Sequence, residues 1–269
     1  MRRTFAVRRN DEPRSNEGMQ SYDAPYMSRG DDRPSPLRGR VNDPHSPPVA
    51  PVEKIGRYSL IQSGSGQKLT EDTLLLADFI LPLKKDDIVA DLGAGPGALA
   101  LILASRSPVK RIVCVEVQRP LCGLALENVA INGLTDRVEV IEKDFRELPA
   151  IYPEGSFSLI VSNPPYMKAG EGRVSPVKER AISRTGIFGG LEELIDASKY
   201  LCGPYGRICY VFPARRLDEM CAEIERAGLR KRRLRLIYTR MDREAKLFLI
   251  EAGKKGELKV EEPVYLRGY

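Results

Sequence analysis

Short apolar runs alternate with longer segments of helical periodicity over most of the chain. The apolar runs, which predict strands, lie at 88–92, 111–117, 138–144, 157–162 and 207–212. Apolar residues at helical spacing predict helices at 96–105, 120–131, 191–201 and 216–227. Two final strands are expected at 231–238 and 246–252. This alternation is typical of an α/β fold with a parallel, doubly wound sheet.

A further strand and helix are expected before this repeat. Residues 58–62 have the pattern of a short strand, and a Gly/Ser turn follows at 63–66. Apolar residues from 74 to 80 then form one face of a helix. Thr70 is its expected N-cap, with acidic residues in the first turn.

Residues 1–52 differ in composition from the rest of the chain. They mix Arg, Asp, Pro and Ser without apolar periodicity, and eight prolines fall among them. Such a segment cannot bury enough apolar surface to offset its ordering entropy. We therefore expect a disordered tail at 1–52 and one folded domain at 53–269. Arginines in the tail offer non-specific contacts to RNA, but a tail without a specific partner is the simpler interpretation.

Composition narrows the classes of function. The net charge of +6 and the pI of about 9.0 suit an anionic partner such as RNA. No apolar stretch is long enough to cross a bilayer, and no apolar segment follows the basic N-terminus, so neither a membrane anchor nor a secretory signal is expected. Five cysteines without a C-x-x-C pair indicate reduced thiols in a cytoplasmic protein. The single histidine, His45, excludes a histidine-based metal site or Ser-His-Asp triad, and no metal is expected.

A glycine-rich loop joins the strand at 88–92 to the next helix. It contains Asp91, Gly93, Ala94, Gly95 and Gly97. Its glycines allow a tight turn and a close approach of the backbone to a ligand, and the helix N-terminus behind them favours negative charge. The spacing is G-x-G-x-G rather than the G-x-G-x-x-G of dinucleotide sites, and a proline removes one N–H donor, so a carboxylate ligand is favoured over a diphosphate. A glycine turn without a ligand is the alternative.

Two acidic residues stand at the ends of the next two strands. Glu116, followed by Val117, lies about twenty residues past the glycines, where a carboxylate can accept hydrogen bonds from both ribose hydroxyls. Asp144 is a candidate acceptor for the exocyclic amine of an adenine, whose ring Phe145 would cover. A solvated strand end or a turn is the alternative interpretation of each acidic residue.

This loop with acidic residues at two further strand ends resembles the class I methyltransferases that use S-adenosylmethionine. The resemblance implies a Rossmann-like sheet of seven strands, mainly parallel, with an antiparallel strand near one edge. It also implies that Asp91 lies near the methionine amino group and that the glycine loop lies beneath the methionine part. Glu116 would bind the ribose, and Asp144 the adenine.

The motif Asn163-Pro164-Pro165-Tyr166 follows the strand at 157–162. Its prolines lack N–H donors, so what remains is acceptors: the Pro164 carbonyl and the Asn163 side-chain oxygen. Two acceptors suit an NH2 group, because they draw its nitrogen toward tetrahedral geometry and free its lone pair for in-line attack on a sulfonium methyl. Tyr166 offers a face for stacking a planar base or amide. In known families this motif accompanies methylation of base amino groups, guanine N2 or a glutamine amide.

Further segments resemble the tRNA adenine-N6 methyltransferases that act beside the anticodon of valine tRNA. They lie at 67–79, 174–184, 231–238, 245–252 and 262–265. The resemblance covers about residues 55–266 and implies transfer of a methyl group to the N6 amine of an anticodon-loop adenine in tRNA. Family members often carry Arg-His-Glu where this chain has Arg184-Thr185-Gly186.

Two groups of basic residues are candidates for RNA contacts. The first follows the motif and consists of Lys168, Arg173, Lys178, Arg180 and Arg184. A solvated loop is the alternative for this group. The second group, at 230–235, falls on an expected edge strand, where Lys and Arg often serve only to prevent aggregation. We slightly favour that explanation over RNA binding.

Three other functions remain open at this point. One is N5-methylation of a glutamine in a protein such as a release factor, although those enzymes usually carry a helical domain where this chain has a Pro-rich tail. Another is methylation of an amine in rRNA. The third, a non-catalytic RNA-binding module, is disfavoured by the intact glycine loop, Glu116 and the motif at 163–166.

Overall fold

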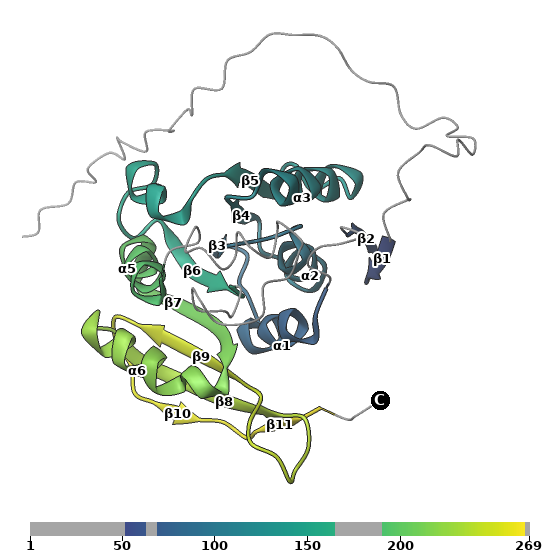
Figure 1. The fold of residues 1–269 in the computed structure, drawn as a ribbon. Helices are drawn as coiled ribbons and strands as arrows, with labels where there is room; N and C mark the ends of the chain where they lie inside the picture. Colours follow the sequence, from purple (N-terminus) through teal and green to yellow (C-terminus); the bar gives the residue numbers. More distant parts are fainter. Residues whose placement is uncertain (1–51, 63–68, 165–189, 267–269) are drawn as a thin grey trace, which may run out of the picture. The chain divides into compact units, whose positions relative to one another are not determined.

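Nine strands form one mixed sheet in the computed structural model, which describes residues 52–62, 69–164 and 190–266 (Figure 1). The strand order is β10–β8–β9–β7–β6–β3–β4–β5, and β11 also pairs with β8. The strands are β3 Ile88–Leu92, β4 Arg111–Glu116, β5 Val138–Glu142, β6 Phe157–Ser162, β7 Cys202–Pro213, β8 Arg230–Tyr238, β9 Leu247–Gly253, β10 Lys259–Val260 and β11 Val264–Tyr265. β9 runs antiparallel to both neighbours, whereas the other pairs are parallel. The expected seven-stranded arrangement is confirmed, with β10 and β11 as additions that the sequence did not predict.

Helices cover both faces of this sheet. The α-helices in the described residues are α1 Glu71–Ile80, α2 Ala98–Arg106, α3 Arg119–Ile131, α5 Leu191–Leu201 and α6 Leu217–Arg226. The 3-10 helices are η1 Phe145–Ala150 and η2 Ala214–Arg216. Successive strand residues point to opposite faces: Val89 and Leu159 pack with α1 and α2, whereas Ala90 and Ile160 pack with α5 and α6. Because both faces are buried, the strands are apolar runs rather than alternating ones.

The C-terminus of α1 is stabilised by arginines from the sheet. The helix has no basic residue in its last turn. Instead, Arg207 of β7 donates to the Ile80 carbonyl (3.0 Å), and Arg233 of β8 donates to the Phe79 carbonyl (3.0 Å). Cations at this end also complement the helix dipole. At the other end Thr70 is the N-cap as expected, although its side chain makes no capping hydrogen bond.

A two-stranded hairpin precedes α1 in the chain. Its strands are β1 Val52–Ile55, which the sequence did not predict, and β2 Tyr58–Ile61. Two side-chain amides of α3 pair with the backbone of β2. Asn128 accepts from Ile61 N (2.7 Å) and donates to Ile61 O (2.9 Å), and Asn132 does the same with Ser59 (2.9 and 2.7 Å). These amides satisfy backbone groups of β2 that β1 does not reach.

The basic run on β8 does not lie on an open edge, which corrects the expectation for 230–235. β10 and β11 pair with β8 on its outer side. Arg233 lies 3.0 Å from Glu251 and 2.7 Å from Glu261, and it stacks over the Phe79 ring. Arg235 and Arg232 pair with the same two glutamates. The carboxylates neutralise these guanidinium groups inside the fold.

The cysteines lie mostly inside the fold. Cys114, Cys122, Cys202 and Cys209 are buried, Cys221 is half-buried, and all five are unbridged. Of the helices in the described segments, none is long and apolar enough to span a membrane. The expected disordered tail at 1–52 lies outside the described residues, apart from Val52, which begins β1.

Candidate active site

Three strands end together where the strand order of the sheet reverses. β3 lies between β4 and β6, and all three run parallel. In the register of the sheet, Asp91 lies opposite Cys114 of β4 and opposite Val161 of β6. Glu116 follows Cys114 by two residues, and Asn163 follows Val161 by two residues. Ligands of open α/β sheets bind at this point, outside the carboxyl ends of the strands. The fold therefore brings the candidate residues of β3, β4 and β6 to one edge.

The glycine loop between β3 and α2 depends on left-handed backbone. Gly93, Gly95 and Gly97 have φ angles of 80°, 57° and 80°. Other L-residues are strained in this region, so these glycines are required by the turn itself. The N–H groups of Gly93 and Ala94 donate to the Val115 carbonyl (2.8 and 3.0 Å), which fixes the loop against β4.

Gly97 is the N-cap of α2, which begins at Ala98 rather than at residue 96 as predicted. A Cβ at Gly97 would lie 3.5 Å from the Cβ of Ala125 in α3. The close approach at Gly97 is thus between the N-terminus of α2 and α3.

Asp91 is a buried acid whose charge the surrounding protein does not compensate. The residue is 2% exposed, and within the described part of the chain its Oδ2 has no hydrogen-bond partner. Burial, and then the nearby charge of Glu116, raises the pKa of Asp91 from 3.8 to about 7. A buried acceptor of this kind is costly unless a ligand supplies a donor or a cation.

Glu116 connects β4 to the glycine loop. Its Oε2 accepts from Gly95 N and its Oε1 from Gln118 N, both at 2.8 Å. Burial raises its pKa, and these hydrogen bonds offset part of that effect. The Val117 backbone and the Gln118 side chain also hydrogen-bond to this carboxylate and lower its pKa. The half-buried Val117 follows directly.

Asp144 and Phe145 have structural roles at the end of β5. Asp144 caps η1: its Oδ1 accepts from Arg146 N (2.9 Å) and from the Arg146 guanidinium (3.0 Å). Burial raises the pKa of Asp144, but the hydrogen bonds and charge of Arg146 outweigh this and lower it. Phe145 is buried in the core beside the sheet. Contacts of these two residues with an adenine stay a prediction.

Asn163 is held by a side chain that the sequence did not single out. Its Nδ2 donates to Oγ1 of Thr73 in α1 (3.1 Å). The preceding residue, Ser162, donates to the Leu92 carbonyl at the end of β3 (2.5 Å). The end of β6 is thereby fixed to both α1 and β3. Pro165, Tyr166 and the five basic residues at 168–184 lie outside the described residues.

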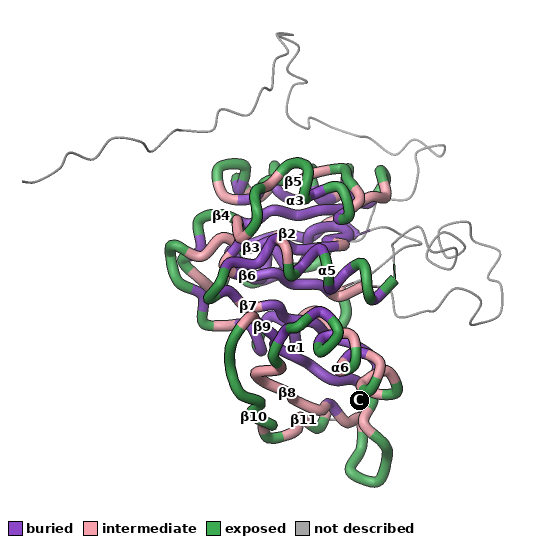
Figure 2. The backbone as a smooth tube through the Cα atoms, turned by 90° about the vertical axis from the view of Figure 1, so that its left-hand side faces the viewer, coloured by how far each residue is buried: buried purple, intermediate pink, exposed green. Residues whose placement is uncertain are grey.

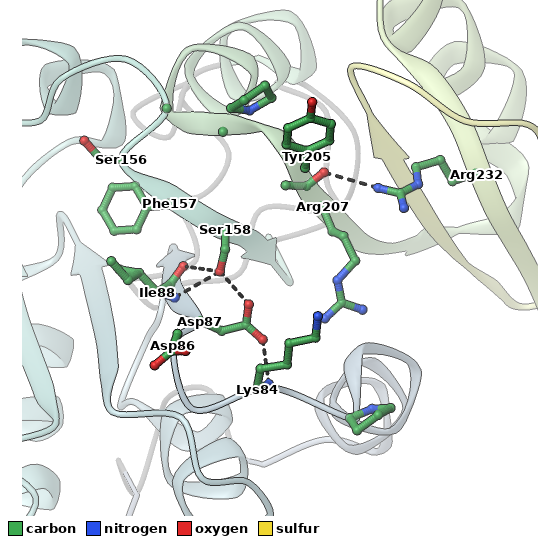
Figure 3. A pocket seen from close by; sticks show the side chains of 15 residues that line it. Lys84, Asp86, Asp87, Ile88, Ser156, Phe157, Ser158, Tyr205, Arg207 and Arg232 are labelled. Carbon is green, nitrogen blue, oxygen red and sulfur yellow. Dashed lines mark hydrogen bonds between the residues drawn. The ribbon is translucent and has the colours of Figure 1, made fainter. Parts of the chain in front are cut away.

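A cavity of about 620 Å³ lies at the opposite edge of the sheet, near the amino ends of β3 and β6 (Figure 3). Asp87 accepts there from Ser158 Oγ (2.8 Å) and from Lys84 N (2.7 Å), and Arg232 donates to Gly206 O (3.2 Å). These polar groups bond to one another, and the cavity includes none of the candidate site residues. No group of three or more His, Cys, Asp or Glu side chains in the described ranges is placed to hold a metal ion.

Comparisons with known proteins bear on the family and the fold of the chain. Residues 65–185 match the family model of the methyltransferase small domain. A protein of Aeromonas hydrophila named tRNA1(Val) (adenine(37)-N6)-methyltransferase is 34% identical over 190 residues, which cover 70% of this chain and 77% of the relative. A protein of the same name from Porphyromonas gingivalis is 28% identical, with coverages of 72% and 78%. The fold is similar to a predicted O-methyltransferase of Agrobacterium tumefaciens, with a TM-score of 0.56, 22% identity and coverages of 72% and 86%.

Proposed function

Because this chain belongs to the family of the tRNA1(Val) (adenine(37)-N6)-methyltransferases, we propose that it transfers the methyl group of S-adenosylmethionine to the N6 amine of an anticodon-loop adenine in tRNA. The observation that supports this most directly is the meeting of Asp91, Glu116 and Asn163 at the carboxyl ends of β3, β4 and β6. We further propose that residues 53–269 form the catalytic domain and that 1–52 lie outside it.

The residues at this edge fit S-adenosylmethionine. The unpartnered Oδ2 of Asp91 suits the ammonium group of the methionine part, since a cation would repay the cost of burying the acid. Glu116, an acceptor that ends the neighbouring strand beside the glycine loop, suits the ribose hydroxyls. Gly93 has open space where a Cβ would be, so its backbone can face a ligand closely. We assign the adenine contacts to Asp144 and Phe145, and further contacts to Ala94 and Val117.

The role of Asn163 and Pro164 is to orient the target amine. S-adenosylmethionine, when bound, supplies a methyl group on a sulfonium that an amine nitrogen can attack. The Asn163 side-chain oxygen and the Pro164 carbonyl would accept the two protons of the adenine amine. Two such bonds fix the nitrogen and direct its lone pair, and this alignment is the main contribution the chain makes. Tyr166 would stack on the unpaired base, and the basic residues at 168–184 would hold its phosphates.

The experiment is methyl transfer to tRNA with a nucleoside readout. The protein is incubated with methyl-labelled S-adenosylmethionine and unmodified bulk tRNA, and the tRNA is digested to nucleosides. Label in N6-methyladenosine is expected, and its absence would refute the proposed substrate. Asn163→Ala should abolish transfer while the affinity for S-adenosylmethionine stays within a few-fold. A loss of cofactor binding in that variant would instead assign Asn163 to the cofactor site.

The same assay separates the alternative functions. The relatives described above are named for tRNA adenine, which favours that substrate over a glutamine amide. Label incorporated into a release factor but not into tRNA would favour protein methylation. Label in rRNA alone would move the substrate to the ribosome.

A further inference from the structure

The loop between β8 and β9 lies outside the carboxyl ends of the parallel strands, on the same side of the sheet as the candidate active site. β8 is parallel to β7, because β9 runs antiparallel to both. The carboxyl end of β8, at Tyr238, therefore faces the edge where Asn163 follows β6. Ala214 N donates to Lys246 O (3.0 Å), so the end of β7 is joined to this loop. Three strand spacings of about 4.8 Å separate β6 from β8, or roughly 14 Å.

An aromatic pair lies at the base of this loop. β11 pairs with β8 in parallel and brings Tyr265 opposite Tyr238. The two rings stack with centroids 5.3 Å apart and planes inclined by 25°. One face of Tyr265 is thereby covered, yet the residue is still 44% exposed. This exposed part of the ring suits a base, because aromatic side chains stack on nucleobases in single-stranded nucleic acids.

Exposed cations accompany this pair. In the loop, Arg240 is paired with Asp242 (2.9 Å), whereas Arg243 and Lys246 are exposed and have no side-chain partner among the described residues. Glu244 is the remaining acidic residue of the loop, and Met241 is 84% exposed. Figure 2 shows the loop as an exposed segment beyond the end of β8. Arg232, Arg233 and Arg235 within β8 differ, because each is paired with Glu251 or Glu261.

From this juxtaposition we infer that Tyr238, Met241, Arg243, Lys246 and Tyr265, named here the β8–β9 rim, bind the tRNA strand that flanks the target adenine. This inference rests on the proposed function. Arg243 and Lys246 contact phosphates, and the exposed face of Tyr265 stacks on a base. Tyr265 on β11 lies one strand beyond β8, so the rim lies roughly 14 to 19 Å from β6. Nucleotides of a stacked strand rise by about 3.4 Å each, so the rim contacts lie roughly four to six nucleotides from the adenine. Exposed cations beside a ring with one available face favour RNA over a protein partner.

Two pairs of variants test the rim by tRNA binding. Arg243→Ala combined with Lys246→Ala should weaken tRNA binding about tenfold and lower the slope of log Kd against log salt concentration by roughly 1.5 to 2, because two phosphate contacts are lost. Lys85→Ala combined with Lys110→Ala removes two exposed cations at the opposite edge and should change neither quantity. Tyr265→Ala should weaken binding about tenfold, and Tyr265→Phe should restore it.

The outcomes distinguish the rim from the proposed function. S-adenosylmethionine affinity and kcat at saturating tRNA should be unchanged in the rim variants, since only the KM for tRNA rises. If the wild type methylates adenine but the rim variants bind tRNA with unchanged Kd and salt slope, the rim inference is overturned. If the wild type leaves tRNA unlabelled but binds it in a rim-dependent way, the rim stands and the proposed function fails. Rim variants that lose methylation of a release factor alone would overturn the RNA assignment.

Discussion

Replacing Asp91 by asparagine should stabilise the cofactor-free protein, and more so at high pH. Asp91 is buried, its Oδ2 has no hydrogen-bond partner in the part of the chain that the structure describes, and its pKa is raised from 3.8 to about 7. The folded state therefore resists ionisation of this carboxyl, whereas the unfolded chain ionises it readily. Any stability associated with the protonated acid is fully present below pH 3.8 and is lost as the pH rises toward 7. Asparagine does not titrate and so avoids this loss.

The size of the effect follows from the two pKa values. Each pH unit between them costs about 1.36 kcal/mol, so the full cost of ionising Asp91 is about 4 kcal/mol. Roughly 2.6 kcal/mol of this develops between pH 5 and pH 8. The buried asparagine amide has a constant desolvation cost of about 1–3 kcal/mol, which lowers the gain at both pH values equally. The quantity to measure is therefore the difference in the free energy of unfolding between Asp91→Asn and wild type, and how this difference changes from pH 5 to pH 8.

Urea unfolding at pH 5 and pH 8, followed by circular dichroism, measures that difference. With an m-value of about 2–3 kcal/mol/M, the midpoint of Asp91→Asn relative to wild type should rise by about 1 M from pH 5 to pH 8. Asp86→Asn, which removes an exposed carboxylate, controls for the loss of one acid. An equal midpoint difference at both pH values would refute the reasoning, because Asp91 would then ionise alike in the folded and unfolded states.

Four further substitutions test individual contacts. Thr73→Val removes the hydroxyl that holds Asn163 and should lower kcat about tenfold without changing the Kd for S-adenosylmethionine, while Thr73→Ser should retain activity. Gly97→Ala places a side chain at a φ of 80° and should cost about 1–2 kcal/mol, seen in calorimetry as a Tm lower by roughly 2–8 °C. Glu116→Gln should weaken S-adenosylmethionine binding in titration calorimetry about 10- to 100-fold, because charged hydrogen bonds are lost. Glu251→Gln removes the paired carboxylate of Arg207 and Arg232 and one of the two carboxylates paired with Arg233, and should cost about 3–5 kcal/mol in urea unfolding, with no direct effect on the tRNA salt slope.

Local patterns were sufficient to predict the main parts of the site. The turn at Gly93–Gly97 needs glycine for backbone reasons alone, and Asp91 and Glu116 end strands whose apolar runs are visible in the sequence. Parallel strands place such ends at one edge, so the site followed from periodicity. The same reasoning would have found Glu251, a charged residue inside an apolar strand.

Contacts between distant residues were not predictable in this way. Thr73 lies 90 residues before Asn163, and nothing in its helix distinguishes it from a solvated threonine. The two-residue strands β10 and β11 are too short to produce a periodic signal, yet they cover the strand that was expected at the edge. The hydrogen bonds from Arg146 to Asp144 were not predicted either, because the turn sets the direction of the Asp144 side chain.

The Asn128 side chain links the β1–β2 hairpin to the glycine loop, so the stability of each depends on the other. Its amide is 0% exposed, and its Nδ2 donates both to Ile61 O and to Pro96 O at 2.9 Å. Removing the hairpin would take away one partner of this amide, at a cost of about 1 kcal/mol, directly beside the glycine loop. We therefore expect that a shortened form of the protein keeps its affinity for the cofactor only if it retains the whole hairpin from Val52 onward. The hairpin supports the glycine loop through Asn128.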